Sequence, residues 1–331
     1  MSLDETPLQV PAQSIPVPGS VGAEGRAYLA AAARRLAARE TPGAVSDVAR
    51  ELQDTETRFL EFLRPLAARF RGSFESITLP SGAKLHRVTP DGRTGRLSEV
   101  AYFDIHGGGF LVGGGEMCQL IAKIRAIEYG AQIYSVDYRL LPEHPYPAGL
   151  DDCVAAYREI LAHREPSTLA VAGPSAGGNL AAALLLRARD AGLPLPAALV
   201  LQTPVLDLTR SGDSLVTNRF LDVNLYAGAG EHLLCQYAAN TDVIHPYVSP
   251  LFGDFSKGWP PTILTTGTRD LLLSDTVRMH RALRRAGIRA ELHVSEASPH
   301  GGFMLASAPE DAEISTECRR FIYSAWGHSA L

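Results

Sequence analysis

The sequence predicts an α/β fold, with a mostly parallel central sheet, helices on both faces and an additional helical cap. Two observations indicate the sheet and the helices that cover it. From about residue 100 onward, short apolar, β-branched segments alternate with helical ones, a pattern typical of parallel sheets buried between helices. In addition, an apolar run passes through Gly173-Pro174-Ser175-Ala176-Gly177-Gly178 directly into a helical segment. Small residues around a serine are typical of a tight strand-to-helix turn.

Length and composition indicate a globular protein. The chain has 331 residues, of which 46% are hydrophobic and 20% charged, with a formal net charge of -5. This length fits one large domain, or a domain with an insertion. Nucleic acids and anionic membranes attract basic surfaces, so the negative net charge argues against both as main partners. We therefore expect no nucleic-acid partner and no stable membrane insertion.

The cysteines and the N-terminus suggest where the protein works. Four widely spaced cysteines occur, at Cys118, Cys153, Cys235 and Cys318, without Cys-x-x-Cys or Cys/His ligand spacing. This favours free thiols in a reducing compartment and no metal site. The first residues contain no basic segment followed by an apolar core, as a signal peptide would. We expect a cytoplasmic location.

Helical patterns precede the first strand. Residues 1–20 carry several prolines and are expected to form a loose arm. Residues 22–40 and 46–70 have the apolar spacing of helices, and Pro65 is expected to kink or restart the second one. An apolar-faced helical pair at the end of a chain packs over another part of the protein, either as a lid or as ordinary core packing. We assign residues 1–72 to an N-terminal helical arm that contributes to the cap.

The rest of the chain alternates between strands and helices with one interruption. Residues 207–247 are mixed in polarity and contain no clean strand, which is typical of an insertion over the sheet. We therefore assign residues 73–206 and 246–331 to the α/β domain and residues 207–245 to a cap insertion. Strands are expected at 76–79, 84–89, 100–105, 132–136, 168–172, 197–202, 262–266 and 289–294. Helices are expected at 118–129, 150–164, 274–286 and 310–325, and a further helix is expected to follow the serine turn and run to Asp190.

The serine of the turn needs partners if it is to act as a nucleophile, because a serine hydroxyl is a weak nucleophile at neutral pH. Where a serine on such a turn is the nucleophile, a carboxylate and then a histidine come later in the sequence. Asp270 follows the strand at 262–266, and His300 follows the strand at 289–294. Asp275 is a competing acid inside the expected helix. Singly, a helix cap or a surface histidine would explain these residues. Together, and in this order, they favour a Ser175, Asp270 and His300 triad.

A glycine-rich loop follows the expected strand at 100–105. The stretch His106-Gly107-Gly108-Gly109 can direct backbone N–H groups at a developing oxyanion, and Ala176 supplies another donor after the serine. The alternative is a dinucleotide-binding loop. Gly107, Gly109 and Gly113 give Gly-x-Gly-x-x-x-Gly, one residue too long for that fingerprint, so we reject it.

These motifs resemble the hormone-sensitive-lipase-like branch of the α/β-hydrolases, the bacterial family IV carboxylesterases. The resemblance covers about residues 100–321 and rests on His106–Phe110, Asp137–Glu143 with Pro147-Ala148, the turn at Gly173–Gly178, Ser249-Pro250-Leu251 and the acid and histidine loops. It implies an α/β-hydrolase fold, and it makes a homodimer one of the assembly states to expect. It implies the Ser175–Asp270–His300 triad and an oxyanion hole made by Gly107, Gly108 and Ala176. His106 would brace its loop rather than act as the base.

The resemblance predicts a function and has one exception. We expect a serine carboxylesterase that acts on small to medium, short-acyl esters through an acyl-enzyme, without a metal or organic cofactor. The alternatives are an amidase, lactonase or deacetylase with the same triad, or a ligand-binding protein without catalysis. Pro174 stands where the family has an acidic residue, which leaves the substrate preference open. Pocket-wall candidates, for which ordinary packing is an equal explanation, are Phe220, Leu221, Leu225, Tyr226 and either Phe59 or Leu63.

Overall fold

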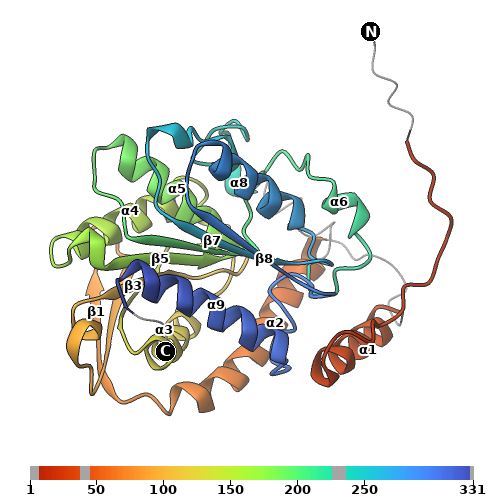
Figure 1. Cartoon of the computed structure of the whole chain (residues 1–331), viewed down its shortest axis with the longest axis horizontal. Coiled ribbons are helices and arrows are strands. Elements are labelled where there is room, and N and C mark those ends of the chain that lie inside the picture. The colour runs from red at the N-terminus through yellow and green to blue at the C-terminus, as the bar shows by residue number, and fades with distance from the viewer. Residues whose placement is uncertain (1–6, 38–44, 226–235, 329–331) are drawn as a thin grey trace, which may run out of the picture.

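The computed structural model of the chain describes residues 7–37, 45–225 and 236–328. In these residues, eight strands form one sheet in the order β1-β2-β4-β3-β5-β6-β7-β8 (Figure 1). β1 and β2 pair antiparallel, as do β2 and β4, and the remaining pairs are parallel. The predicted α/β fold with a mostly parallel sheet is confirmed. The strands are β1 Gly72–Thr78, β2 Lys84–Pro90, β3 Ala101–Ile105, β4 Gln132–Asp137, β5 Leu169–Pro174, β6 Ala198–Gln202, β7 Thr262–Gly267 and β8 Ala290–Ser295.

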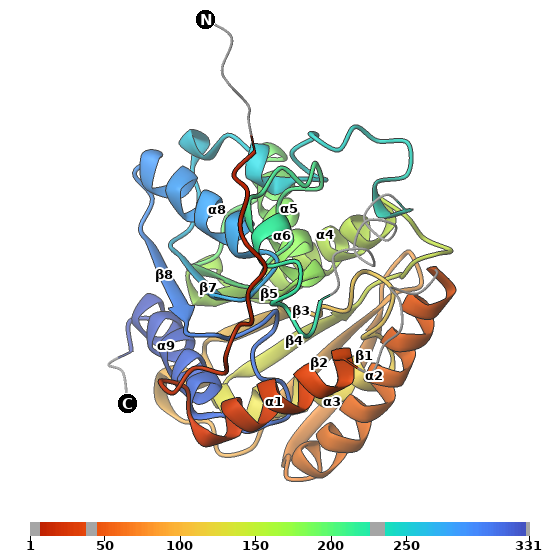
Figure 2. The ribbon, with the colours of Figure 1, turned by 90° about the vertical axis from the view of Figure 1, so that its right-hand side faces the viewer.

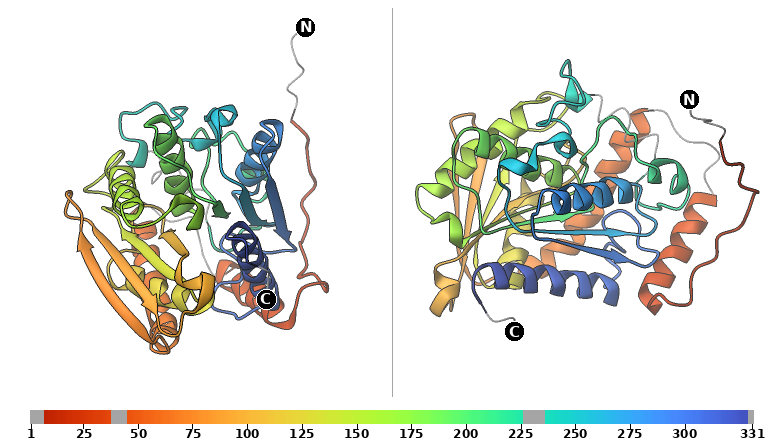
Figure 3. Two further views of the ribbon diagram at one scale, coloured as in Figure 1. Left: turned by 60° about the vertical axis from the view of Figure 1, so that its left-hand side comes forward. Right: turned by 45° about the horizontal axis from the view of Figure 1, so that its top comes forward.

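Helices cover both faces of the sheet, as Figure 3 shows. One face packs against α4 (Ala148–Leu161), α5 (Ala176–Asp190) and α8 (Leu273–Arg285). The other packs against α3 (Glu116–Tyr129) and α9 (Pro309–Ala325). The remaining helices are α1 Ala23–Ala37, α2 Val45–Ala67 and the short α6 Ser214–Thr217, with 3-10 turns at Gly95–Ser98, Pro166–Thr168, Pro250–Phe252 and Phe255–Lys257.

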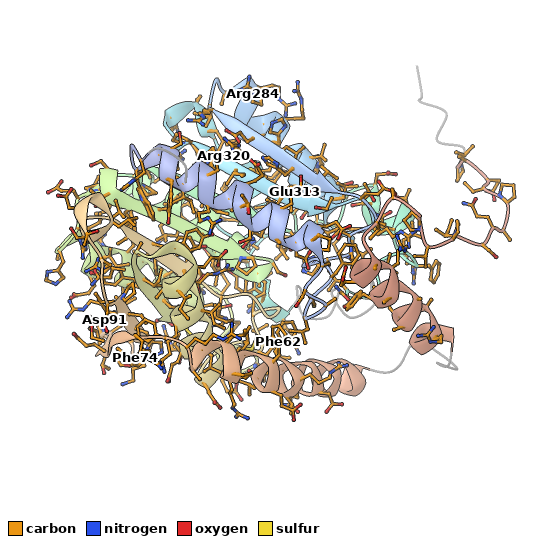
Figure 4. The ribbon with its side chains drawn as sticks, turned by 60° about the horizontal axis from the view of Figure 1, so that its bottom comes forward. Phe62, Phe74, Asp91, Arg284, Glu313 and Arg320 are labelled. Carbon is orange, nitrogen blue, oxygen red and sulfur yellow. The ribbon has the colours of Figure 1, made fainter. Side chains whose placement is uncertain are left out.

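Two apolar layers hold the helices to the sheet because successive strand residues point to opposite faces. In β3, Phe103 packs in the layer under α4 and α5, whereas its neighbour Tyr102 packs in the layer under α3 and α9. Figure 4 shows α9, with Glu313 and Arg320 labelled, lying over this face of the sheet. Fully burying one such aromatic or aliphatic side chain stabilises the fold by about 1.5–3 kcal/mol. The free thiols of Cys153 and Cys318 lie in these layers, and the free thiol of Cys118 on α3 is buried beside the Ser135 hydroxyl.

Most predicted elements are present with ends shifted by one to three residues, such as α4, which was predicted at 150–164 and spans Ala148–Leu161. Two elements differ in form as well. β1 begins at Gly72 rather than at residue 76, because its first residues pair with the end of β2 from Gly72 opposite Pro90 onward. α2 is one element from Val45 to Ala67 and contains Pro65, which was expected to kink or restart it. Proline removes one helical N–H, but both Pro65 and Glu61 on the preceding turn face water, which can satisfy the orphaned carbonyl.

The N-terminal elements lie against the α/β domain. Figure 2 shows the extended arm leading into α1, with α2 beside α3. The Arg269 guanidinium donates to the Pro16 carbonyl at 2.9 Å, and the Gly22 N–H donates to Glu310 Oε1 at 2.6 Å. The arm and α1 thus border the loop after β7 and the start of α9. None of the helices in the described ranges combines the length and apolar character needed to cross a bilayer.

Candidate active site

Ser175 occupies a strained turn between β5 and α5. Its backbone has φ 53° and ψ -118°, a conformation that costs a residue other than glycine about 1–3 kcal/mol. The turn is held in place because the Ser175 N–H donates to the Gln202 carbonyl at 2.9 Å and the Val205 N–H donates to the Ser175 carbonyl at 3.1 Å. A Cβ at Gly173 would lie 2.2 Å from the Gly177 carbonyl oxygen, so only glycine allows strand and helix to meet this closely.

Pro174 fits the end of β5 without removing a sheet hydrogen bond. Successive N–H groups of a strand point to opposite neighbours, and that of Ser175 points to Gln202 on β6. The nitrogen of Pro174 therefore faces the β3 side, where pairing with β5 already ends at Asp104 opposite Ala172. The backbone of the turn accommodates proline at this position.

The structure brings Ser175, His300 and Asp270 into one hydrogen-bonded chain. His300 Nε2 lies 2.9 Å from Ser175 Oγ, and His300 Nδ1 lies 3.0 Å from Asp270 Oδ1. Asp270 is fixed in turn by Thr266 Oγ1, which donates to Oδ2 at 2.7 Å, and by the Leu272 N–H, which donates to Oδ1 at 2.9 Å. A carboxylate on Nδ1 fixes the tautomer that leaves the Nε2 lone pair free to accept the serine proton.

Asp275, the competing acid, has a different position. Its Oδ2 accepts hydrogen bonds from the Leu206 N–H at 2.8 Å and from the Asp207 N–H at 3.0 Å, beyond the end of β6. Burial raises the pKa of Asp275 to about 7. In the part of the chain that the structure describes, Asp275 braces this loop, and Asp270 is the carboxylate on His300.

The surroundings of His300 favour its charged form. Burial lowers the pKa of the imidazole, but the charge and hydrogen bond of Asp270, together with the charge of Asp222, outweigh it, so the pKa is raised above its ordinary value. An imidazolium that forms during proton transfer from Ser175 would thus be stabilised by two carboxylates.

The glycine-rich loop leaves backbone donors beside the serine. Gly108 has φ 105°, and a Cβ there would lie 2.1 Å from the Val112 carbonyl oxygen, so the loop requires glycine. Among the hydrogen bonds found between described residues, none uses the N–H groups of Gly107, Gly108 or Ala176. Ala176 also begins α5, whose N-terminus carries a partial positive charge. All three donors can serve an anionic oxygen.

His106 holds the glycine-rich loop, as expected. Its Nδ1 donates to the Gly107 carbonyl at 2.8 Å, its own carbonyl accepts from the Tyr138 hydroxyl at 3.0 Å, and its ring stacks on Tyr138 at 4.1 Å between centroids. Burial lowers the pKa of His106, which keeps its imidazole neutral.

Sequence reasoning missed a group of polar residues behind the acid and histidine loops. Asn218 Nδ2 donates to the Asp270 carbonyl at 2.8 Å, Asp222 Oδ2 accepts from the Leu271 N–H at 2.8 Å, and Asn224 Nδ2 donates to the His300 carbonyl at 2.8 Å. The only sequence signal is a cluster of Asn and Asp within the segment assigned to the cap insertion.

The candidate pocket walls divide into two groups. Phe220 is 84% exposed, with the Arg219 guanidinium near its ring, so the described residues enclose no pocket around it. Leu221, Phe59 and Leu63 are partly buried, and Leu225 packs against the main core. Tyr226 lies outside the described residues.

The comparison with family models decides the assignment. A model described as the alpha/beta hydrolase fold matches residues 102–304, which include the glycine-rich loop, the serine turn, Asp270 and His300. The chain belongs to the α/β-hydrolase fold family. Solved structures of this family agree. The chain superposes on an esterase called E25 with a TM-score of 0.84 at 31% identity, covering 98% of this chain and 99% of that one. An esterase of the bacterial hormone-sensitive lipase family gives a TM-score of 0.75 at 27% identity, covering 93% and 98% of the two chains. The resemblance to the hormone-sensitive-lipase-like branch is confirmed.

Curated α/β-hydrolase relatives match over a shorter part of the chain. An acetyl-hydrolase of Streptomyces hygroscopicus is 36% identical over 184 residues, 55% of this chain and 61% of that protein. The carboxylesterase NlhH of Mycobacterium tuberculosis is 34% identical over 215 residues, 62% of this chain and 66% of that protein. The chain thus spans just under two thirds of the length of these curated relatives.

Proposed function

We propose that the protein is a serine carboxylesterase that hydrolyses small to medium, short-acyl esters. The observation that carries the proposal is the hydrogen-bonded chain from Ser175 Oγ through His300 to Asp270 at a strained strand-to-helix turn. Relatives named acetyl-hydrolase and carboxylesterase support the ester and short-acyl assignments.

The proposed reaction proceeds through an acyl-enzyme. His300 Nε2 takes the hydroxyl proton as Ser175 Oγ forms a bond to the ester carbonyl carbon. The N–H groups of Gly107, Gly108 and Ala176 stabilise the resulting oxyanion. His300 then returns the proton to the leaving alcohol. A water molecule, deprotonated in turn by His300, attacks the acyl carbon and releases the acid and free Ser175.

The direct test combines labelling with hydrolysis. The full chain should hydrolyse p-nitrophenyl acetate and butyrate, and a fluorophosphonate probe should attach to Ser175. A matched ester and amide pair should give the higher kcat/KM for the ester. Faster cleavage of the amide would change the assignment from an esterase to an amidase that uses the same catalytic residues. Absence of both labelling and hydrolysis would leave a ligand-binding protein. The homodimer and the cytoplasmic location stay predictions.

As the pH is lowered, the rate of hydrolysis should fall at a higher pH than an ordinary histidine would cause. A protonated His300 cannot accept the serine proton, and the pKa of His300 is raised. The rate should therefore fall, as pH decreases, around a midpoint above the ordinary imidazole value of about 6.5. The pH dependence of kcat/KM for p-nitrophenyl acetate measures this midpoint. A midpoint well below that value would contradict the proposed electrostatics.

We propose that residues 1–72 and 207–245 form the cap over the site. Support comes from α2, where Glu56 Oε1 accepts a hydrogen bond from the Gly113 N–H of the glycine-rich loop at 3.3 Å. α2 is also tied to α3 by the exposed Arg64–Glu116 ion pair. A cap that holds this loop would influence both substrate binding and oxyanion stabilisation.

Removing residues 1–70 should therefore impair the enzyme. Deletion takes away α1 and α2, which removes the packing of α2 on α3 and uncovers the apolar cluster around Phe303 near His300. We expect either insolubility or a loss of at least about tenfold in kcat/KM, since small displacements of active-site groups are costly. A control that lacks residues 1–14 retains α1, α2 and Pro16 and should keep its activity. A soluble 71–331 protein with unchanged kinetics would contradict the cap.

A further inference from the structure

One carboxylate outside the Ser175–His300–Asp270 chain touches both loops that carry it. Asp222 is only 2% exposed, and its Oδ2 accepts the Leu271 N–H at 2.8 Å. Both of its oxygens lie 3.3 Å from the His300 backbone nitrogen, which donates to them. Leu271 follows Asp270 directly, so a single side chain bridges the backbones of the acid loop and the histidine loop.

The same carboxylate closes its own turn. Asp222 Oδ1 accepts the N–H groups of Asn224 at 2.9 Å and of Leu225 at 3.0 Å. Four backbone donors thus surround a buried carboxylate, which compensates for its removal from water. Asp222 therefore holds the two loops from a turn that its own hydrogen bonds close.

We propose that Asp222 is a positioning residue that keeps His300 aligned between Ser175 and Asp270 and adds a second negative charge behind the imidazole. The proposal rests on the proposed esterase function. The alignment depends on the spacing of the two loops, since the 3.0 Å contact of His300 with Asp270 joins one loop to the other. A carboxylate that binds the backbones of both loops fixes this spacing.

A neighbouring asparagine extends this support to the N-terminal helix. Asn224 Nδ2 donates to the carbonyls of His300 and Gly302, at 2.8 and 2.9 Å. The Tyr28 hydroxyl of α1 donates to Asn224 Oδ1, and its ring meets Phe303 edge-on at 6.1 Å between centroids. Helix α1 therefore reaches the histidine loop through the turn that Asp222 closes.

The charges around His300 give Asp222 an electrostatic effect as well as a mechanical one. Asp270 faces the imidazole from the loop after β7, and Asp222 faces it from the insertion. From α9, the Asp311 carboxylate accepts a hydrogen bond from the Phe303 N–H. From α1, the Tyr28 hydroxyl donates to Asn224, which in turn donates to the His300 carbonyl. Burial, followed by the charge of Asp270, raises the pKa of Asp222 to about 6, so the group is ionised at pH 8. Its charge then favours the imidazolium.

The test compares Asp222→Asn with Asp213→Asn, an exposed aspartate of the same segment. The amide in Asp222→Asn would carry no charge and would point its N–H₂ at backbone N–H groups. We expect kcat for p-nitrophenyl acetate to fall about tenfold or more with KM within about threefold, since alignment matters in the transition state. The acid midpoint of kcat/KM should move down by about half a pH unit or more, because the imidazolium loses a favourable charge. Asp213→Asn should match the wild type in kcat, in KM and in the acid midpoint of kcat/KM.

A merely structural role gives a different result. An Asp222→Asn protein with lowered thermal stability but wild-type kcat and acid midpoint would overturn the proposal. If Asp222→Asn does not fold, Asp222→Glu keeps the charge, and its acid midpoint should stay at or above that of the wild type. A lower midpoint in that variant would overturn the proposal too. Failure of the esterase function itself would differ from both results, because the wild type would then neither hydrolyse esters nor bind the probe.

Discussion

Ser175→Ala is expected to lower kcat for p-nitrophenyl acetate on the order of 10³–10⁶-fold. The hydroxyl lies 2.9 Å from His300 Nε2, and without it no acyl-enzyme can form. Alanine keeps the Cβ at φ 53°, so the turn itself should persist and thermal stability should change little. Steady-state kinetics and circular dichroism of the purified variant measure both quantities. Residual hydrolysis would reflect water attack assisted by the oxyanion donors.

An exposed serine supplies the control for this substitution. Ser256 lies on the surface in the 3-10 turn Phe255–Lys257, and Ser256→Ala should retain wild-type kcat and labelling. The fluorophosphonate adduct should vanish in Ser175→Ala only. Undiminished ester hydrolysis by Ser175→Ala would exclude Ser175 as the nucleophile.

Asp270→Asn is expected to have the second largest effect, a fall in kcat on the order of 10³–10⁴-fold. The carboxylate accepts the Nδ1–H of His300, whereas an amide can present its N–H₂ there. The imidazole would then carry its proton on Nε2, facing Ser175, and could not accept another. Substrate binding does not depend on this proton, so KM should move far less than kcat. The pH dependence of kcat should also lose its wild-type acid midpoint.

Asp275→Asn separates the two aspartates that the sequence left in competition. Asp275 is buried, as Asp270 is, but binds the N–H groups of Leu206 and Asp207. Its substitution should leave kcat within about threefold, because it does not touch the reacting groups. A larger loss in Asp275→Asn than in Asp270→Asn would reverse the assignment of the acid.

Local patterns predicted much of the fold. Apolar, β-branched runs predicted the strands because a strand buried between two helical layers has no polar face to show. The predicted start of β1 was wrong, since pairing with β2 decides it, and α2 does not restart at Pro65, whose neighbourhood is exposed to water. Neither condition can be seen in a short stretch of sequence.

The sequence by itself determined the serine turn and the order of the candidate site residues. Glycines beside Ser175 and a polar residue after each later strand are local features, and parallel strands bring their carboxyl ends to one edge of the sheet. The sequence favoured Asp270 over Asp275, and the tertiary structure puts the Asp270 carboxylate against His300. Only the tertiary structure gave Asp222 a role. The donors to Asp222 from the two loops lie 49 and 78 residues further along the chain, so no spacing rule connects them. The glycines that its backbone conformation requires identify Ser175 in the sequence, whereas Asp222 can be identified only from contacts that form when the chain folds.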